Sequence, residues 1–302
     1  MYDVLVIGAG PAGMTAAIYA ARAGYKTAMA EVGVPGGQAA TTEIIENYPG
    51  FPNGVAGPDL MYKFFEQTQT FGVEMLYGYV EGIDTADETK KVKIGDNVYE
   101  SKTVIIASGA KPKTLGVANE DRLRGRGVSY CATCDGFFFK DKEVMVVGGG
   151  DTAVEEAMYL TKMCSKVTLI HRREQLRANR TAQNRALANE KLEIIYNTTL
   201  EEIIGEDKVT SVRLKNKITG EETIMPIEGI FIFAGYTPNN DFFPSQLAVD
   251  ERGYVLTDEK MATNLPGIFA VGDVRQKPLR QVTTAVGDGG VVITAVEDYL
   301  AQ

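Results

Sequence analysis

The sequence contains no tryptophan, one histidine (His171) and only three cysteines among its 302 residues, and acidic residues outnumber basic ones. The formal net charge of −9 argues against a nucleic-acid-binding or anionic-membrane surface, because such surfaces need a basic field. No apolar run approaches the ~20 residues of a membrane span, and the chain starts without the features of a signal peptide. We therefore expect a cytoplasmic protein with no nucleic-acid and no membrane partner.

Two of the three cysteines are close together. Cys131 and Cys134 form a Cys-x-x-Cys pair, which in a reducing cytosol indicates catalysis or metal binding rather than a structural crosslink. Cys164 falls in a predicted amphipathic helix, where a free cysteine usually packs as a small hydrophobe. A zinc site would need these three cysteines and His171 as ligands, but the Cys-x6-His spacing is unusual for zinc. The pattern favours a redox pair, with metal binding as the alternative.

A strand, a glycine-rich loop and a helix open the chain. Tyr2–Ile7 is a continuous apolar run, typical of a buried parallel strand, and it leads into Gly8-Ala9-Gly10-Pro11-Ala12-Gly13. We predict a helix over Pro11–Ala23 and a second strand over Thr27–Ala30. Such glycines allow a tight turn and the close approach of a pyrophosphate, whose charge meets the helix N-terminus. Glu31, at the tip of the second strand, can accept from ribose hydroxyls.

The same order recurs in the middle of the chain. Gly148-Gly149-Gly150-Asp151-Thr152-Ala153 lies after a predicted strand, Lys142–Val147, and a helix (Thr152–Met163) and a strand (Lys166–Ile170) are predicted to follow. His171 stands 21 residues after Gly150, just as Glu31 stands 21 residues after Gly10. The nucleotide-binding unit is therefore duplicated.

The second copy carries basic residues where the first carries an acid. His171 is followed by Arg172 and Arg173, and Arg177 lies one turn further on. Guanidinium groups can bind a 2′-phosphate bidentately, so the second site favours NADP, whereas the first suits FAD or NAD. We expect the lone histidine to orient the phosphate site or to pack at the strand end.

The remaining segments indicate how the two copies are connected. Alternating segments over Leu76–Val104 and Leu192–Phe233 predict antiparallel hairpins, and proline-bearing connections near 110–116 and 235–244 resemble hinges. A final helix, from about Thr283 to Leu300, starts no third unit and would return to the first domain. The sequence thus predicts an α/β protein with two Rossmann-like, three-layer ββα dinucleotide-binding domains. The second domain, 113–240, would be inserted between the two parts of the first, 1–112 and 241–302.

The residues after the cysteines have two interpretations each. Asp135 could donate and accept the protons that dithiol chemistry moves, or it could cap a helix. Phe137, Phe138 and Phe139 cannot all point into a core from one short segment, so some of them are expected to form an exposed contact for a partner, with core packing as the alternative.

At these residues the chain closely resembles the bacterial-type, low-molecular-weight thioredoxin reductases, which are NADPH- and FAD-dependent pyridine nucleotide-disulfide oxidoreductases. The resemblance covers the full length, in blocks that follow the same order. Besides the two glycine motifs, the blocks are Gly36-Gly37-Gln38, Ile45–Gly50, Gly125–Val128, Cys131–Phe138, His171–Arg173 with Arg177, Gly267–Asp273 and Arg280-Gln281-Val282.

The resemblance implies FAD on the outer domain and NADPH on the inserted one. The implied FAD contacts are Gly8, Gly10, Gly13, Glu31, Gly37, Gln38, Asn47, Asp273, Gln281 and Val282. The implied NADPH contacts are Gly148, Gly150, Asp151, Thr152, His171, Arg172, Arg173 and Arg177. The last helix would direct its positive N-terminal end at the flavin ring.

The resemblance also implies the reaction and the partners. Hydride would pass from NADPH to FAD, the reduced flavin would reduce a Cys131–Cys134 disulfide, and the dithiol would reduce oxidised thioredoxin. Asp135 would be catalytic with the two cysteines, and Cys134 would be the flavin-proximal thiol and the one that attacks thioredoxin. Contacts with thioredoxin are implied for Arg126, Phe137 and Phe138. A homodimer and a rotation of the inserted domain between half-reactions are implied as well.

Other hypotheses stay open at this point. The same chemistry could serve another acceptor, such as a peroxiredoxin partner, a glutaredoxin-like protein or a small dithiol oxidised at the expense of oxygen. A flavin-binding redox sensor without useful turnover is a second possibility, although the complete cysteine pair and nucleotide site argue against it. A zinc-stabilised binding module is the remaining non-enzymatic hypothesis.

Overall fold

The computed structural model describes residues 1–42 and 44–302, and they form two compact units. Unit 1 comprises Met1–Lys111 and Thr237–Gln302, whereas unit 2 comprises Pro112–Tyr236. In the described residues, no helix combines the length and the apolar character that crossing a membrane requires. Each unit has its own sheets and cores, which are described in turn.

Unit 1 is built on a sheet with the strand order β3-β2-β1-β6-β5-β4, in which β17 also pairs with β6. The pairs β1–β2, β1–β6, β2–β3 and β6–β17 are parallel, whereas β4–β5 and β5–β6 are antiparallel. The strands are β1 (Tyr2–Ile7), β2 (Thr27–Glu31), β3 (Glu74–Tyr77), β4 (Val80–Asp84), β5 (Lys90–Ile94), β6 (Asn97–Ile106) and β17 (Ile268–Ala270). The helices are α1 (Pro11–Arg22), α2 (Gly57–Thr70) and α6 (Val282–Leu300), with short 3-10 turns η1 (Gly37–Thr41) and η3 (Gly272–Val274).

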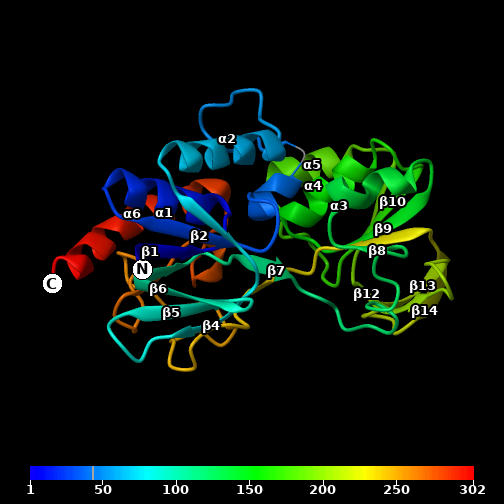
Figure 1. Ribbon diagram of the computed structural model, residues 1–302. Helices are drawn as coiled ribbons and strands as arrows, with labels where there is room; N and C mark the ends of the chain where they lie inside the picture. Colours follow the sequence, from blue (N-terminus) through cyan, green and yellow to red (C-terminus); the bar gives the residue numbers. More distant parts are fainter. Residues whose placement is uncertain (43) are drawn as a thin grey trace. The chain divides into compact units, whose positions relative to one another are not determined.

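The side chains of β1 alternate between two cores and so create three layers. Val4 and Val6 belong to the core under the helices, whereas Leu5 and Ile7 belong to the core on the opposite face of the sheet. Figure 1 shows α1, α2 and α6 on one side of the unit 1 sheet and the β4–β5 hairpin on the other. The predicted ββα layering is confirmed here.

Unit 2 repeats the plan with a parallel sheet of order β11-β10-β9-β15-β8 and a separate antiparallel sheet, β12-β13-β14. Helices α4 and α5 pack on one side of the parallel sheet and the antiparallel sheet packs on the other (Figure 1). The strands are β8 (Val128–Ser129), β9 (Glu143–Val147), β10 (Lys166–Ile170), β11 (Leu192–Ile195), β12 (Thr198–Ile204), β13 (Ser211–Asn216), β14 (Glu222–Pro226) and β15 (Gly229–Ile232). The helices are α3 (Ala132–Asp135), α4 (Asp151–Leu160) and α5 (Arg180–Leu187), and the 3-10 turn η2 spans Gly136–Phe139.

The two segments that join the units pair with each other. Strands β7 (Ala110–Pro112) and β16 (Tyr236–Pro238) form a two-stranded sheet, and each of them contains one of the prolines of the predicted connections. That these strands act as hinges stays a prediction.

One helix boundary differs from the sequence prediction. Helix α4 ends at Leu160, so Cys164 lies beyond the helix and not within it. The N–H groups of Met163 and Cys164 both donate to the carbonyl oxygen of Leu160, at 3.1 and 2.8 Å, which tightens and ends the helix. Cys164 is nevertheless fully buried in the helical core of unit 2, as its role as a small hydrophobe requires.

Candidate active site

In the loop between β1 and α1, one glycine has no space for a side chain, whereas another faces open space. A Cβ atom on Gly13 would lie 1.9 Å from the carbonyl oxygen of Gly8, whereas a Cβ atom on Gly10 would meet nothing within 4 Å. Gly10 directly precedes α1, so the open space lies at the N-terminus of a twelve-residue helix. The aligned peptide dipoles favour an anion at that end, and the opening fits a pyrophosphate.

Glu31 is fixed at the tip of β2 by backbone donors. Its Oε2 accepts from the N–H of Ala9 at 2.8 Å, and its Oε1 accepts from the N–H groups of Val32 and Gly33 at 2.8 and 3.1 Å. A carboxylate has about four acceptor positions, so at least one remains for a ribose hydroxyl. The carboxylate therefore lies beside the glycine loop, in the position predicted for it.

Further predicted residues lie at the N-terminal ends of α1 and α6 and in η1. Asn47 donates from Nδ2 to Oε1 of Gln281, at 3.0 Å, and Gln281 is the N-cap of α6, directly before Val282. A Cβ atom on Gly272 would lie 2.7 Å from Cβ of Ala12, so η3 and its Asp273 lie against the start of α1. Gln38 follows Gly37 in η1 and donates to the carbonyl oxygen of Ala110.

Asp273 carries an unsatisfied acceptor at this place. Its Oδ1 is buried and accepts no hydrogen bond from the described residues, and burial raises the pKa of its carboxyl group. A buried acceptor without a donor is unfavourable by about 1–3 kcal/mol, so a ligand hydroxyl would stabilise it. The residues of unit 1 therefore fit a nucleotide cofactor with hydroxyl groups.

The second glycine loop has the same opening. Nothing would lie within 4 Å of a Cβ atom on Gly150, and α4 begins at the next residue. The carbonyl oxygen of Gly149 accepts from the N–H groups of Arg177 and Ala178, at 2.6 and 3.1 Å. The segment that carries the arginines therefore folds back onto the loop.

Arg172, Arg173 and Arg177 are exposed at the end of β10. Arg173 and Arg177 line a surface cavity of about 450 Å³. In the described parts of the chain, no carboxylate pairs with any of the three guanidinium groups, which leaves them available to a phosphate.

Two predicted nucleotide contacts of unit 2 hold the loop itself. Asp151 accepts at Oδ1 from the backbone and side-chain amides of Asn179, at 2.7 and 2.8 Å. His171 is 5% exposed, and its Nδ1 lies 2.8 Å from the carbonyl oxygen of Gly148. Burial lowers the pKa of His171, so the imidazole is neutral and donates from Nδ1 to Gly148. The expectation that His171 packs at the strand end is confirmed, and its burial disfavours a direct nucleotide contact.

Cys131 and Cys134 are joined by a disulfide at the start of α3. Cys134 is exposed, whereas Cys131 is half-buried and accepts at Sγ from the N–H of Cys134, at 3.2 Å. The exposed Cys134 sulfur is the one that an external disulfide can approach.

Asp135 lies beside the pair with its carboxyl group half-buried. Its Oδ2 accepts from Oγ of Ser129 at 2.6 Å, and its side chain makes no capping bond to the turn that follows. The helix-cap interpretation is therefore wrong, whereas the proton-transfer role stays a prediction. Ser129 was not singled out in the sequence, since no motif marks it.

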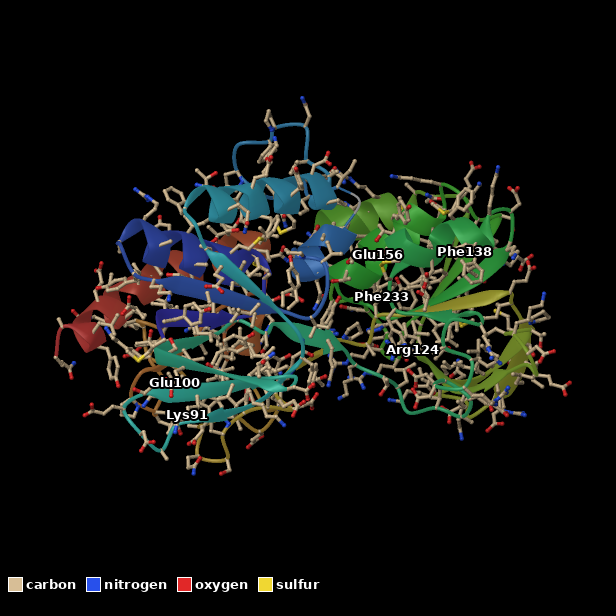
Figure 2. All side chains as sticks on the ribbon, viewed as in Figure 1. Lys91, Glu100, Arg124, Phe138, Glu156 and Phe233 are labelled. Carbon is tan, nitrogen blue, oxygen red and sulfur yellow. A yellow bond between two sulfur atoms is a disulfide. The ribbon has the colours of Figure 1, made fainter. Side chains whose placement is uncertain are left out.

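The three phenylalanines divide as expected. Phe137 and Phe138 are 75% and 70% exposed, whereas Phe139 is buried and packs edge-to-face on Phe231. Arg126 is also exposed, and Figure 2 labels Phe138 on unit 2. The prediction that not all three aromatic rings are buried is confirmed.

The zinc interpretation finds no support in the described residues. They contain no group of three or more His, Cys, Asp or Glu side chains arranged to hold a metal ion. Cys131 and Cys134 are bonded to each other, and burial raises the pKa of Cys164 to about 11, which keeps its sulfur protonated. A buried, protonated thiol is a poor zinc ligand.

Comparison with known proteins identifies the family. Residues 2–289 match the family described as pyridine nucleotide-disulphide oxidoreductase. The whole chain is 52% identical to the thioredoxin reductase of Listeria innocua, of which it covers 95%, and 50% identical to that of Bacillus subtilis, of which it covers 96%. A crystal structure of Lactococcus lactis thioredoxin reductase, 48% identical, matches with a TM-score of 0.97 over 100% of this chain and 99% of that chain. The chain belongs to the thioredoxin reductase family.

Membership of the thioredoxin reductase family confirms the resemblance and the α/β fold with two Rossmann-like domains. It also confirms that the chain is an oxidoreductase, and it implies the use of a flavin and a pyridine nucleotide. The Cys131–Cys134 disulfide agrees with the redox-active disulfide of a thioredoxin reductase.

One feature of this thioredoxin reductase family member was missed in the sequence. Asp288, in α6, is 8% exposed and accepts from Lys277 at 2.7 Å, from Arg275 at 3.0 Å and from the N–H of Gly272 at 2.9 Å. These bonds fasten the chain on both sides of Asp273 to the first half of α6. Asp288 could not be recognised from the sequence, because its hydrogen-bond donors lie 11 to 16 residues away from it along the chain.

Proposed function

We propose that this chain is an NADPH-dependent, FAD-containing thioredoxin reductase. The observation that carries the proposal is the Cys131–Cys134 disulfide, with Cys134 exposed, on the same unit as the second nucleotide loop and its unpaired arginines. An exposed disulfide next to an acid is suited to exchange with another disulfide. The family relatives that bear the name thioredoxin reductase support thioredoxin as the acceptor.

We assign FAD to unit 1. When bound, FAD supplies a two-electron carrier between a nicotinamide and a disulfide. The opening at Gly10 suits its pyrophosphate, Glu31 suits a ribose hydroxyl, and the unsatisfied Oδ1 of Asp273 suits a further hydroxyl. The other residues proposed to hold it are Gly8, Gly13, Gly37, Gln38, Asn47, Gln281 and Val282.

We assign NADPH to unit 2. Its pyrophosphate would lie at Gly150 and the start of α4, near Gly148 and Thr152, and its 2′-phosphate would bind Arg172, Arg173 and Arg177. His171 and Asp151 would act by holding the loop and the arginine segment in place.

The residues of the pair perform the exchange. In the dithiol form, Cys134 attacks the disulfide of thioredoxin, and Cys131 then attacks the mixed disulfide, which releases reduced thioredoxin and restores the Cys131–Cys134 bond. Asp135 moves the protons that this exchange transfers. Arg126, Phe137 and Phe138 are proposed to contact thioredoxin. A homodimer, a cytoplasmic location and a rotation of unit 2 about β7 and β16 belong to the same proposal, on the family resemblance.

The test is steady-state NADPH oxidation by the purified holoprotein, with and without thioredoxin. Wild-type protein should turn over quickly only when thioredoxin is present, and Cys134→Ser should abolish this turnover. Cys164→Ala is the matched control, because Cys164 is the one cysteine outside the pair and it is buried. Reduction of the flavin without any response to thioredoxin would show that the acceptor is another disulfide.

The arginine assignment has its own test. Arg172→Ala combined with Arg173→Ala removes two guanidinium groups, each capable of charge-assisted hydrogen bonds of about 1.5–3 kcal/mol. The KM for NADPH should rise by roughly 10- to 100-fold or more, and the KM for NADH, which lacks the 2′-phosphate, should change little. Arg213→Ala, on the antiparallel sheet of the same unit, is the control for lost positive charge. Equal effects on both nucleotides would contradict the 2′-phosphate site.

A further inference from the structure

A buried serine on β8 contacts the acid beside the cysteine pair. Ser129 is 4% exposed, and its hydroxyl oxygen lies 2.6 Å from Oδ2 of Asp135. The same oxygen accepts from the N–H of Cys131 at 3.1 Å and lies 3.1 Å from the carbonyl oxygen of Cys131. One hydroxyl therefore joins the carboxyl group to the backbone of the first cysteine.

Both ends of this contact are fixed by the backbone. Strand β8 pairs with β15, so that Ser129 lies opposite Phe231, a fully buried residue. At the other end, the N–H of Asp135 donates to the carbonyl oxygen of Cys131, at 3.2 Å, and Ala132 between them is fully buried. Backbone hydrogen bonds therefore fix the positions of both Ser129 and Asp135, independently of the hydrogen bond between their side chains.

A hydroxyl suits a neighbour that gains and loses a proton. It carries one proton and two lone pairs, so it can donate to an ionised carboxylate or accept from a protonated carboxyl group. While Asp135 is ionised, Ser129 donates to its Oδ2. When Asp135 is protonated, the carboxyl O–H can donate to Oγ, and the serine O–H can turn to the carbonyl oxygen of Cys131. The carboxyl group has a partner in both states without any movement of the backbone.

We propose that Ser129 is a positioning residue for proton transfer by Asp135, and this inference rests on the proposed function. In the exchange, the dithiol is oxidised and an external disulfide R–S–S–R is reduced by two electrons. One cysteine sulfur bonds to one sulfur of the external disulfide, and the first R–S⁻ leaves. The second cysteine sulfur then bonds to the first cysteine sulfur and displaces the other R–S⁻, which breaks the mixed disulfide and restores the Cys131–Cys134 bond. The two protons of the dithiol end on the two R–S⁻ groups, and Asp135 accepts and donates each in turn while Ser129 keeps it in place.

The experiment is a single-turnover reaction of the reduced holoprotein with oxidised thioredoxin, in which the rate of thiol transfer is followed. Ser129→Ala removes a hydrogen bond to a charged group and should slow the transfer by roughly 10- to 100-fold, with little change in the KM for thioredoxin. Ser129→Thr keeps a hydroxyl and should restore most of the rate. In an Asp135→Asn background, Ser129→Ala should lower the rate of thiol transfer less than about twofold, because the carboxyl group that Ser129 positions is no longer present.

The control is Ser101→Ala. Ser101 is also a buried strand serine, but its hydroxyl bonds only to backbone carbonyl oxygens, so its loss should leave the rate within about twofold. A near-wild-type rate for Ser129→Ala, or an equal loss with and without Asp135, would overturn the proposal in favour of a purely structural serine. If the alanine variant does not fold, Ser129→Val, which has the shape of Ser129→Thr without the hydroxyl and suits a strand, takes its place in the same double-mutant cycle. If wild-type protein transfers nothing to thioredoxin, the proposed function fails, and the same variants are then compared with glutathione disulfide as the acceptor.

Discussion

At the scale of single residues, His171 is the clearest case of a side chain whose environment decides its role. Its ring lies directly behind the second glycine loop, where a Cβ atom on Gly149 would come within 2.3 Å of Nδ1. The ring therefore requires a glycine at that position, and the glycine in turn lets the ring bond to Gly148. The only imidazole of the chain supports the nucleotide loop instead of titrating in solvent.

This burial predicts a specific pH dependence of stability. Burial, and secondarily the nearby arginines, lowers the pKa of His171 below its ordinary 6.5. The unfolded chain then binds a proton at higher pH than the folded chain, so the stability from the neutral imidazole is complete above about pH 6.5 and is lost as the pH falls. Between about pH 7.5 and 5.5, the Tm of wild-type protein should fall more steeply than that of His171→Asn, which keeps a donor and cannot titrate. Parallel curves for the two proteins would contradict the assignment, and the imidazole NMR signals give the titration directly.

At the scale of elements, Gly10 and Gly13 have different roles although they belong to one motif. Gly13→Ala would place a methyl group 1.9 Å from a backbone oxygen that cannot move aside, so it should destabilise the fold by about 1–3 kcal/mol. Gly10 has a φ of −79°, which any residue adopts, and open space beyond it. Gly10→Ala should therefore fold normally but bind flavin much more weakly.

The two variants serve as each other's control. The flavin-to-protein ratio from the visible absorbance measures binding, and the Tm of the flavin-free proteins measures folding. Gly10→Ala should mainly lower the flavin-to-protein ratio, whereas Gly13→Ala should lower the Tm of the flavin-free protein. Full flavin content in Gly10→Ala would mean that the pyrophosphate does not lie at this opening.

The elements also show what could be predicted from the sequence and what could not. Runs such as Tyr2–Ile7, bounded by glycines, are determined locally, so β1, α1 and the repeated unit were predicted within a residue or two. The end of α4 was not, because no glycine or proline marks it and only the bonds to Leu160 terminate it. The contact between Ser129 and Asp135 needs β8 to pair with β15, about 100 residues away, and such pairing is decided by tertiary structure.

At the scale of the whole molecule, unit 2 carries both the disulfide and an exposed apolar pair. Phe137 and Phe138 lie shortly after the cysteines in the chain, and both side chains are more than two-thirds exposed. Large aromatic rings are unfavourable in water but contribute strongly when a partner covers them. Their position three and four residues after Cys134 means that a protein approaching this sulfur would also meet the rings.

This arrangement predicts how the proposed partner is recognised. Phe137→Ala combined with Phe138→Ala should lower kcat/KM for thioredoxin by roughly 10- to 100-fold, since a loss of about 0.7–1.4 kcal/mol at each truncated interface ring gives that factor for the pair. Reduction of a small aromatic disulfide, which is too small to cover the rings, should continue at nearly the wild-type rate. Ile218→Ala is the matched control, because Ile218 is as exposed as Phe137, at 75%, but lies after β13, away from the cysteines. If the double variant loses both reactions equally, the rings support the disulfide segment itself; if it loses neither, thioredoxin approaches the pair without touching them.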